Sequence, residues 1–322
     1  MLKKIALLLP IIAGTCWGCS GVFVRILDET GFNNITITFS RVSIVVVLLG
    51  LVILVHDRSL FRVPIRQLPL LALVGMAGYF FFSLCYNAAV LKLSLSLATV
   101  LLCTAPVFVI LFSSVLFKEK ITPIRVTCML AALIGCVLMS GIVESCGLKW
   151  SIIGILLGIG SAICNATSIM STNEATDIRK IHPLTVQFYS ALFALVPMFF
   201  LTDYSAIGGF VVERPLTRIL FLIVYALVAA LLPNLLFNIS FKYVDAGVVS
   251  ILAAGAEPTS ALLFGLFIYH EIPTVFGLAG IIIVITAIII LSRSDMAGTG
   301  ASEKDSSECG DDPNLYSCSS LT

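Results

Sequence analysis

Residues 105–122, APVFVILFSSVLFKEKIT, return in altered form as residues 257–274, EPTSALLFGLFIYHEIPT. In each copy a proline precedes an apolar run and a glutamate follows it, and the two prolines, Pro106 and Pro258, are 152 residues apart. A shared proline and glutamate at one fixed offset are not expected from chance similarity between apolar segments, so the sequence predicts an internal repeat. The other matched positions are Glu119 with Glu271 at 152 residues, and Tyr86-Asn87 with Phe237-Asn238 at 151 residues.

The overall composition is that of a membrane protein. Of the 322 residues, 59% are hydrophobic and 11% are charged, whereas a soluble domain carries about 25% charged residues. The net charge of +1 gives no basic surface for nucleic acid. Ten cysteines are spread along a chain too long for a small disulfide scaffold. Cys16-x-x-Cys19 has no second cysteine pair at zinc spacing, so we interpret both as buried small residues and expect neither a metal nor a cofactor.

Ten apolar runs follow one another along the chain, each near the length of about 20 residues that a membrane-crossing helix needs. The fold class predicted is therefore an all-α integral membrane protein with ten transmembrane helices. After the last run, residues 293–322 are rich in Ser, Gly and Asp, and we expect a disordered polar tail there. The predicted spans are 5–25, 34–55, 68–90, 95–117, 123–143, 150–171, 183–202, 219–241, 246–268 and 273–292.

The repeat divides these spans into two halves of five, residues 1–143 and 150–292. Because five is an odd number, the second half must cross the membrane in the opposite direction to the first. The loop charges agree, since Lys118 and Lys120 of the first copy have no lysine counterparts in the second. Inverted repeats of this kind build many secondary transporters, with the binding site near the bilayer midplane at the repeat interface.

The distribution of loop charges also predicts the orientation. The side that holds both termini and the loops after the second, fourth, sixth and eighth spans carries thirteen Lys and Arg, and the opposite side carries five. Because positive charge is concentrated in cytoplasmic loops, both termini are predicted to be cytoplasmic. The start, Met1-Leu2-Lys3-Lys4, resembles that of a signal peptide. The apolar run behind it is too long for a usual signal peptide, so we interpret it as an uncleaved first helix.

With these motifs the chain resembles the EamA-type members of the drug/metabolite transporter superfamily over about residues 5–292. The residues that carry the resemblance are Trp17-Gly18, Arg41 and the two proline–glutamate blocks. It implies ten helices in two inverted five-helix repeats around a central cavity, and export of amino acids or other small metabolites or drugs across the cell membrane. The chain departs from the usual pattern because Thr104-Ala105 places no acid before Pro106.

Two charged residues, Glu257 and Arg41, fall inside predicted spans, where charges are expensive and often functional. Glu257 is a candidate for carrying a coupling proton or for binding a substrate amine. Its alternative role is to satisfy backbone groups freed near Pro258. Arg41 offers a fork of donors to a substrate carboxylate. Its alternatives, which we favour, are pairing inside the protein or reaching the outer interface.

Polar and aromatic side chains also follow one face of several predicted spans, and such faces are expected to point into the bundle. They would contact a substrate, or else hydrogen-bond neighbouring helices with an effect of about 1 kcal/mol each. The predicted cavity residues are Trp17, Tyr79, Tyr86, Asn87, Asn165 and Asn238.

Other motifs favour structural roles. The pattern Gly14-x-x-x-Gly18 in the first span, like its counterpart from Gly154 in the sixth, is typical of closely packed helices. Glu119 and Glu271 stand just before the next predicted helices, where a carboxylate caps free N–H groups. We therefore assign both glutamates, together with the repeat prolines, to the framework.

The function favoured by the sequence is secondary active transport of a small molecule by alternating access, with the lipid bilayer as surroundings and protons as a candidate coupling ion. The alternative is a facilitative channel or uniporter for a small solute. An intramembrane enzyme is disfavoured, because the chain has no H-E-x-x-H, G-x-S-x-G or P-loop pattern and its three histidines all lie at span ends.

Overall fold

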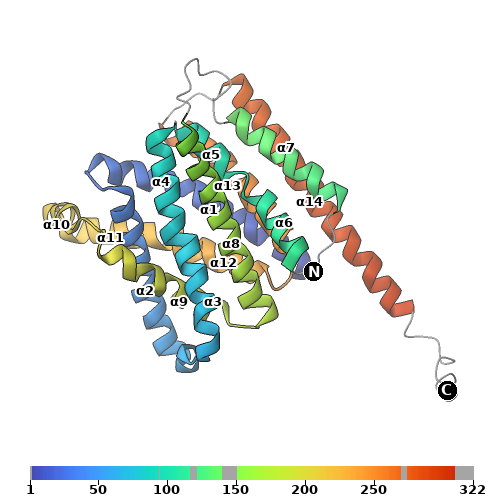
Figure 1. Ribbon diagram of the computed structural model, residues 1–322, viewed down its shortest axis with the longest axis horizontal. Helices are drawn as coiled ribbons and strands as arrows, with labels where there is room; N and C mark the ends of the chain where they lie inside the picture. The colour runs from blue at the N-terminus through green and yellow to red at the C-terminus, as the bar shows by residue number, and fades with distance from the viewer. Residues whose placement is uncertain (1, 94, 117–121, 140–150, 270–273, 309–322) are drawn as a thin grey trace.

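The computed structural model describes residues 2–93, 95–116, 122–139, 151–269 and 274–308, and every regular element in those ranges is helical (Figure 1). The α-helices are α1 (Leu2–Glu29), α2 (Asn34–His56), α3 (Leu68–Gly75), α4 (Phe82–Lys92), α5 (Leu95–Leu102), α6 (Ala105–Leu116), α7 (Pro123–Met139), α8 (Ile152–Asn173), α9 (Pro183–Phe199), α10 (Tyr204–Glu213), α11 (Pro215–Ala226), α12 (Leu232–Ser240), α13 (Ala246–Tyr269) and α14 (Val275–Glu308). Short 3-10 helices, η1 (Arg58–Phe61) and η2 (Ile65–Gln67), precede α3, and π-helical turns η3 (Met76–Phe81), η4 (Glu174–Ile178) and η5 (Leu227–Leu231) follow α3, α8 and α11.

The described helices make the chain a multi-pass membrane protein. Six helical segments are long and apolar enough to cross a membrane, or seven if the bent pair α9–α10 is counted as one span. Three further apolar helical stretches are shorter. They are Val100–Leu116, which covers the end of α5 and all of α6, Pro123–Leu138 in α7 and Val275–Leu291 in α14. Helices thus occupy the predicted spans. Among the described helical segments, six or seven reach full membrane-crossing length.

One predicted span, 95–117, is divided by a break at Cys103–Thr104 between α5 and α6. Pro106 has no N–H group with which to bond the carbonyl of Leu102. The chain instead turns, with the Thr104 hydroxyl donating to the Leu101 carbonyl over 2.6 Å and the Val107 N–H donating to the Thr104 carbonyl over 2.9 Å. Pro258 of the second copy is also inside a helix, yet α13 continues through it.

The predicted loop between the seventh and eighth spans contains a helix. After Phe199 the chain bends by 105° into α10. Asp203 caps this helix, its side chain accepting hydrogen bonds from the N–H groups of Ser205 and Ala206. Phe210 of α10 packs edge-on against Phe32 at 5.3 Å between ring centroids. Helix α10 was not predicted from the sequence, because its ten residues are too few to be recognised as a span.

The last helix is longer than the predicted span 273–292. Helix α14 continues past the predicted span end to Glu308, through residues for which we predicted a polar tail. Residues 309–322 lie outside the described part of the chain, as do Glu119 and Glu271.

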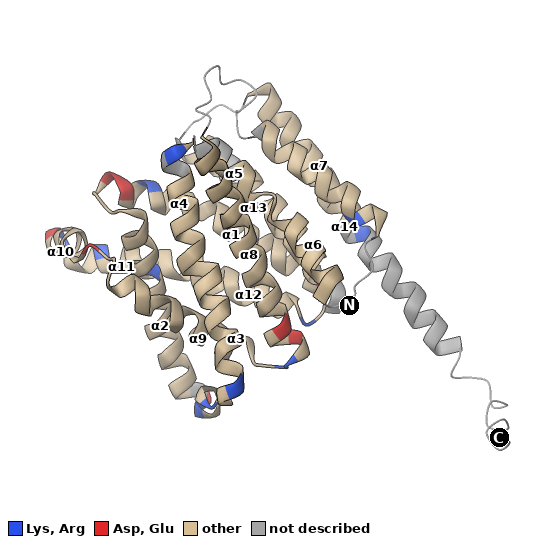
Figure 2. Ribbon diagram, in the orientation of Figure 1, with Lys and Arg blue, Asp and Glu red and all other residues tan. Residues whose placement is uncertain are grey.

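Helix α1 runs along α13 and α12, α2 packs on α9, and α4 packs on α8 (Figure 1). Helices α7 and α14 pair with each other at one side of this bundle. Most described Lys, Arg, Asp and Glu lie at helix ends and in connections, leaving the middle of the bundle largely uncharged (Figure 2). A charged residue in the interior is therefore an exception that needs a structural or functional explanation.

The contact between α1 and α13 depends on two glycines of α1. A Cβ atom on Gly14 would stand 2.6 Å from the Ala253 carbonyl oxygen, and one on Gly18 would collide with the Glu257 carbonyl oxygen and the Ser260 hydroxyl. The backbones therefore approach more closely than any side chain allows, as in other small-residue contacts between membrane helices. This packing fixes the position of the α13 segment that carries Glu257.

We expect Gly18→Ala to destabilise the protein by about 1–3 kcal/mol, because overpacking forces α1 and α13 apart. Gly21→Ala is the matched control, since it lies on the same helix and a Cβ there meets nothing within 4 Å. Unfolding of both variants in mixed detergent micelles would measure the difference. Equal stability of the two would contradict the close contact.

Candidate functional site

Arg41 and Glu257 bring opposite charges into the interior of the bundle. Asn33 caps α2, accepting from the Thr36 N–H over 2.8 Å, and Arg41 follows two turns further on. Glu257 precedes Pro258 in the middle of α13. The Arg41 guanidinium acts electrostatically on the Glu257 carboxylate. No ion pair within 4.0 Å joins the two groups, and the ion pairs found in the described part of the chain involve other residues.

A chain of hydrogen bonds links three further helices beside this pair. Gln187 of α9 donates through Nε2 to the Tyr79 hydroxyl of η3 over 2.9 Å. Asn238 of α12 donates through Nδ2 to Gln187 Oε1 over 3.4 Å. Gln187 is 2% exposed and Asn238 is 6% exposed. An amide is suited to this central place because it donates and accepts at once.

Two hydroxyl groups face Arg41. Its guanidinium acts electrostatically on Tyr79 and on Tyr225 of α11, and Tyr225 is 1% exposed. The Tyr225 hydroxyl also lies within hydrogen-bonding reach of Arg41, although neither it nor Arg41 Nε makes a hydrogen bond of full geometry. Buried polar groups are rarely left unpaired. Arg41 and Tyr225 therefore form a buried polar contact that is incompletely satisfied.

Trp17 lies against the same region from α1. Its ring packs on Phe237 of α12 with 5.2 Å between centroids, and Phe237 in turn packs edge-on against Phe241 at 4.9 Å. Phe237 directly precedes Asn238, so Trp17 contacts the helix that carries Asn238.

Five of the residues singled out in the sequence thus converge, and three others lie on α4 and α8, which both pack on η3. Tyr86 of α4 stacks on Phe82 at 5.7 Å. Asn87 of α4 and Asn165 of α8 lie on helices that pack together. The two hydrogen bonds of the Gln187 amide reach Tyr79 and Asn238 rather than these three side chains. The converging residues are Trp17, Arg41, Tyr79, Asn238 and Glu257.

Two residues of the site, Gln187 and Tyr225, were missed by the sequence analysis. Gln187 carried a usable signal, because an uncharged amide inside the apolar stretch Pro183–Phe199 needs a partner. Tyr225 carried none, since an aromatic residue in a span is equally suited to apolar packing.

We expect Gln187→Leu to lower the free energy of unfolding by about 1–2 kcal/mol, because two hydrogen bonds between helices are lost and each contributes about 0.6–1.7 kcal/mol in a membrane. Tyr79→Phe should lose about half as much, since it removes one bond. Thr286→Val is the control, because its hydroxyl bonds to Ile282 of its own helix. Unfolding in mixed micelles measures the free energy of unfolding of all three variants. An unchanged free energy of unfolding for Gln187→Leu would show that the hydrogen bonds of Gln187 do not stabilise the protein.

Comparison with known proteins gives a consistent picture. The EamA-like transporter family matches residues 4–141 and again residues 152–293. An uncharacterized transporter from Archaeoglobus fulgidus is 26% identical over 296 residues, covering 91% of this chain and 99% of that protein. A protein of known crystal structure superposes with a TM-score of 0.71 at 16% identity, covering 91% of this chain and 98% of that one. The structural likeness concerns the fold alone.

Proposed function

The chain belongs to the EamA-like transporter family, and on that premise we propose that it is a secondary active transporter exporting a small metabolite, an amino acid or a similar molecule, by alternating access. The family that matches the chain and the relative found by sequence similarity are transporters rather than enzymes. A transporter implies a small-molecule substrate and a lipid bilayer as its surroundings.

The observation that carries the proposal is the presence of two opposite interior charges that do not pair with each other. The Arg41 guanidinium can hold a carboxylate through two parallel hydrogen bonds. Glu257 can accept an ammonium group or a proton. A substrate carboxylate held by Arg41, together with a coupling proton carried by Glu257, would satisfy both residues, and the Gln187 network would bind the remaining polar atoms of the substrate.

Two features support an arrangement of ten spans in two inverted repeats, residues 1–143 and 150–292. The same family matches the chain twice, in one stretch of each half. Corresponding helices begin at the offsets of the sequence repeat: η3 and η5 start 151 residues apart, α5 and α13 also 151, and α7 and α14 152. An odd number of spans per repeat places the two repeats in opposite directions, with both termini cytoplasmic in the cell membrane.

Transport assays in proteoliposomes test this proposal directly. We expect saturable uptake of a radiolabelled amino acid from a panel, acceleration by unlabelled substrate on the opposite side, and accumulation driven by a proton gradient. Counterflow requires a binding site that alternates between the two sides. A conductance that does not saturate and shows no counterflow would identify the facilitative channel instead, and no flux of any panel member would count against transport of this substrate class.

A further inference from the structure

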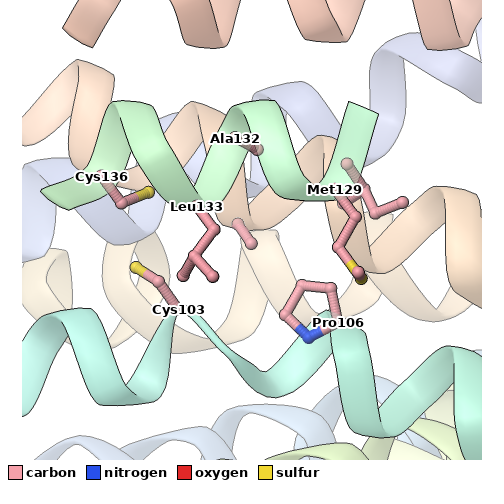
Figure 3. Close-up of a pocket in the computed structure, with 8 residues that line it drawn as sticks. Cys103, Pro106, Met129, Ala132, Leu133 and Cys136 are labelled. Carbon is pink, nitrogen blue, oxygen red and sulfur yellow. The ribbon is translucent and has the colours of Figure 1, made fainter. Parts of the chain in front are cut away.

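A small cavity lies where the chain breaks between α5 and α6. It is bordered by Cys103 and Pro106 at the break, by Met129 and Cys136 of α7, and by Ala254 of α13 (Figure 3). Its accessible volume is about 10 Å³. Such a volume holds one water-sized particle and excludes any metabolite.

Two thiol groups meet at this cavity. Cys103 and Cys136 are both free cysteines, and their thiols interact with each other. Figure 3 shows the two sulfur atoms turned toward one another from the helix break and from α7. Across the described residues, no group of three or more His, Cys, Asp or Glu side chains is placed to hold a metal ion. A cation at this cavity would therefore have two thiolate ligands, and the Met129 thioether is the other sulfur among the lining residues.

We propose that Cys103 and Cys136 form a two-coordinate site for one soft d10 cation, with Hg²⁺ as the best-matched probe. Thiolates select soft metal ions over hard ones. Zn²⁺ is a poor fit, because structural zinc sites need four ligands. At a metal–sulfur distance of about 2.3 Å, the value of zinc–thiolate bonds, a linear complex separates its two sulfurs by about 4.6 Å.

Binding is a proton displacement without electron transfer. Each S–H bond breaks, a metal–sulfur bond replaces it, and two protons per cation leave to the solvent. A dication bound to two thiolates is neutral, which suits an apolar cavity. A monovalent cation would leave a net negative charge close to Glu257, whose carboxylate acts electrostatically on Cys103. We therefore expect Ag⁺ and Cu⁺ to bind more weakly than Hg²⁺.

The bound cation would tie the α5–α6 break to α7. The break is a point at which the backbone is released from regular helical hydrogen bonding, and α7 belongs to the helix pair at the side of the bundle. The cavity is distinct from the proposed substrate site because it is too small for a metabolite, although Glu257 of that site acts electrostatically on Cys103.

The test uses the full chain in detergent, with all cysteines except Cys103 and Cys136 replaced by alanine. Titration with Hg²⁺ in weakly buffered solution should show one ion bound per chain and two protons released. Replacing either remaining cysteine should weaken binding by about 100-fold or more, because one of two metal–sulfur bonds is lost. Circular dichroism and size-exclusion chromatography verify that each variant is folded.

A chain that retains only Cys128 and Cys136 is the matched control. It has the same number of thiols, but eight residues along α7 separate them by about 12 Å, too far to share one cation. We expect weaker binding and one proton released per ion. Equal affinity and proton release in both chains would overturn the proposal, as would absence of tight Hg²⁺ binding by a folded chain that keeps Cys103 and Cys136.

Discussion

Replacing Glu257 with glutamine is expected to abolish substrate accumulation driven by a proton gradient while substrate exchange continues. Glutamine keeps the shape and the hydrogen-bonding oxygen of the side chain but cannot take up or release a proton. Net accumulation requires the empty transporter to return across the membrane in a defined protonation state, and the residue that carries the coupling proton sets that state. Exchange of one substrate molecule for another does not include this step. Loss of accumulation to the level of protein-free vesicles, with counterflow retained, is therefore the result expected for Glu257→Gln.

The measurement compares accumulation and counterflow in the same proteoliposome preparations over a range of pH. Glu213→Gln is the control, since this glutamate lies at the end of α10, is exposed and pairs with Arg218 over 3.1 Å. It should leave both activities unchanged. Full accumulation by Glu257→Gln across the pH range would show that Glu257 does not carry the coupling proton. Loss of both activities in a folded protein would indicate a substrate contact instead.

The helices could be predicted because membrane insertion imposes a simple pattern on the sequence. Runs of about 20 apolar residues have few alternatives to a helix, and the structure has helices at every predicted span that it describes. The α5–α6 break and α10 could not be predicted in the same way. Both depend on local hydrogen bonds and on packing partners, such as Phe32 against Phe210, that are distant in the sequence.

The candidate site was predictable where single residues were conspicuous. Arg41 and Glu257 stood out because charge inside an apolar span requires an explanation. The residues that accompany them depend on tertiary structure, since Gln187 and Tyr79 are separated by 108 positions. The sequence placed Tyr79, Tyr86 and Asn87 together on one face of a single predicted span. That Tyr79 bonds to Gln187 depends on the packing of α9 against η3.

Replacing Arg41 with glutamine is expected to weaken transport of a zwitterionic substrate by about 100-fold, because a buried charge-assisted pair contributes about 2–5 kcal/mol to binding. Arg41→Lys should restore only part of the affinity, since an ammonium group lacks the planar fork of donors. Competition with unlabelled substrate measures affinity, and a comparison between an amino acid and its decarboxylated amine isolates the carboxylate. The wild type should prefer the amino acid, and Arg41→Gln should not.

A purely structural role for Arg41, as a counter-charge for Glu257, predicts a different outcome. Removing Arg41 alone would then leave an uncompensated interior carboxylate, whereas the double variant Arg41→Gln, Glu257→Gln removes both charges together. If Arg41 only balances Glu257, counterflow of the amino acid recovers in the double variant. If Arg41 binds the substrate carboxylate, the double variant stays as defective as Arg41→Gln. Arg66→Gln, an exposed arginine in η2, is the control and should change neither affinity nor preference.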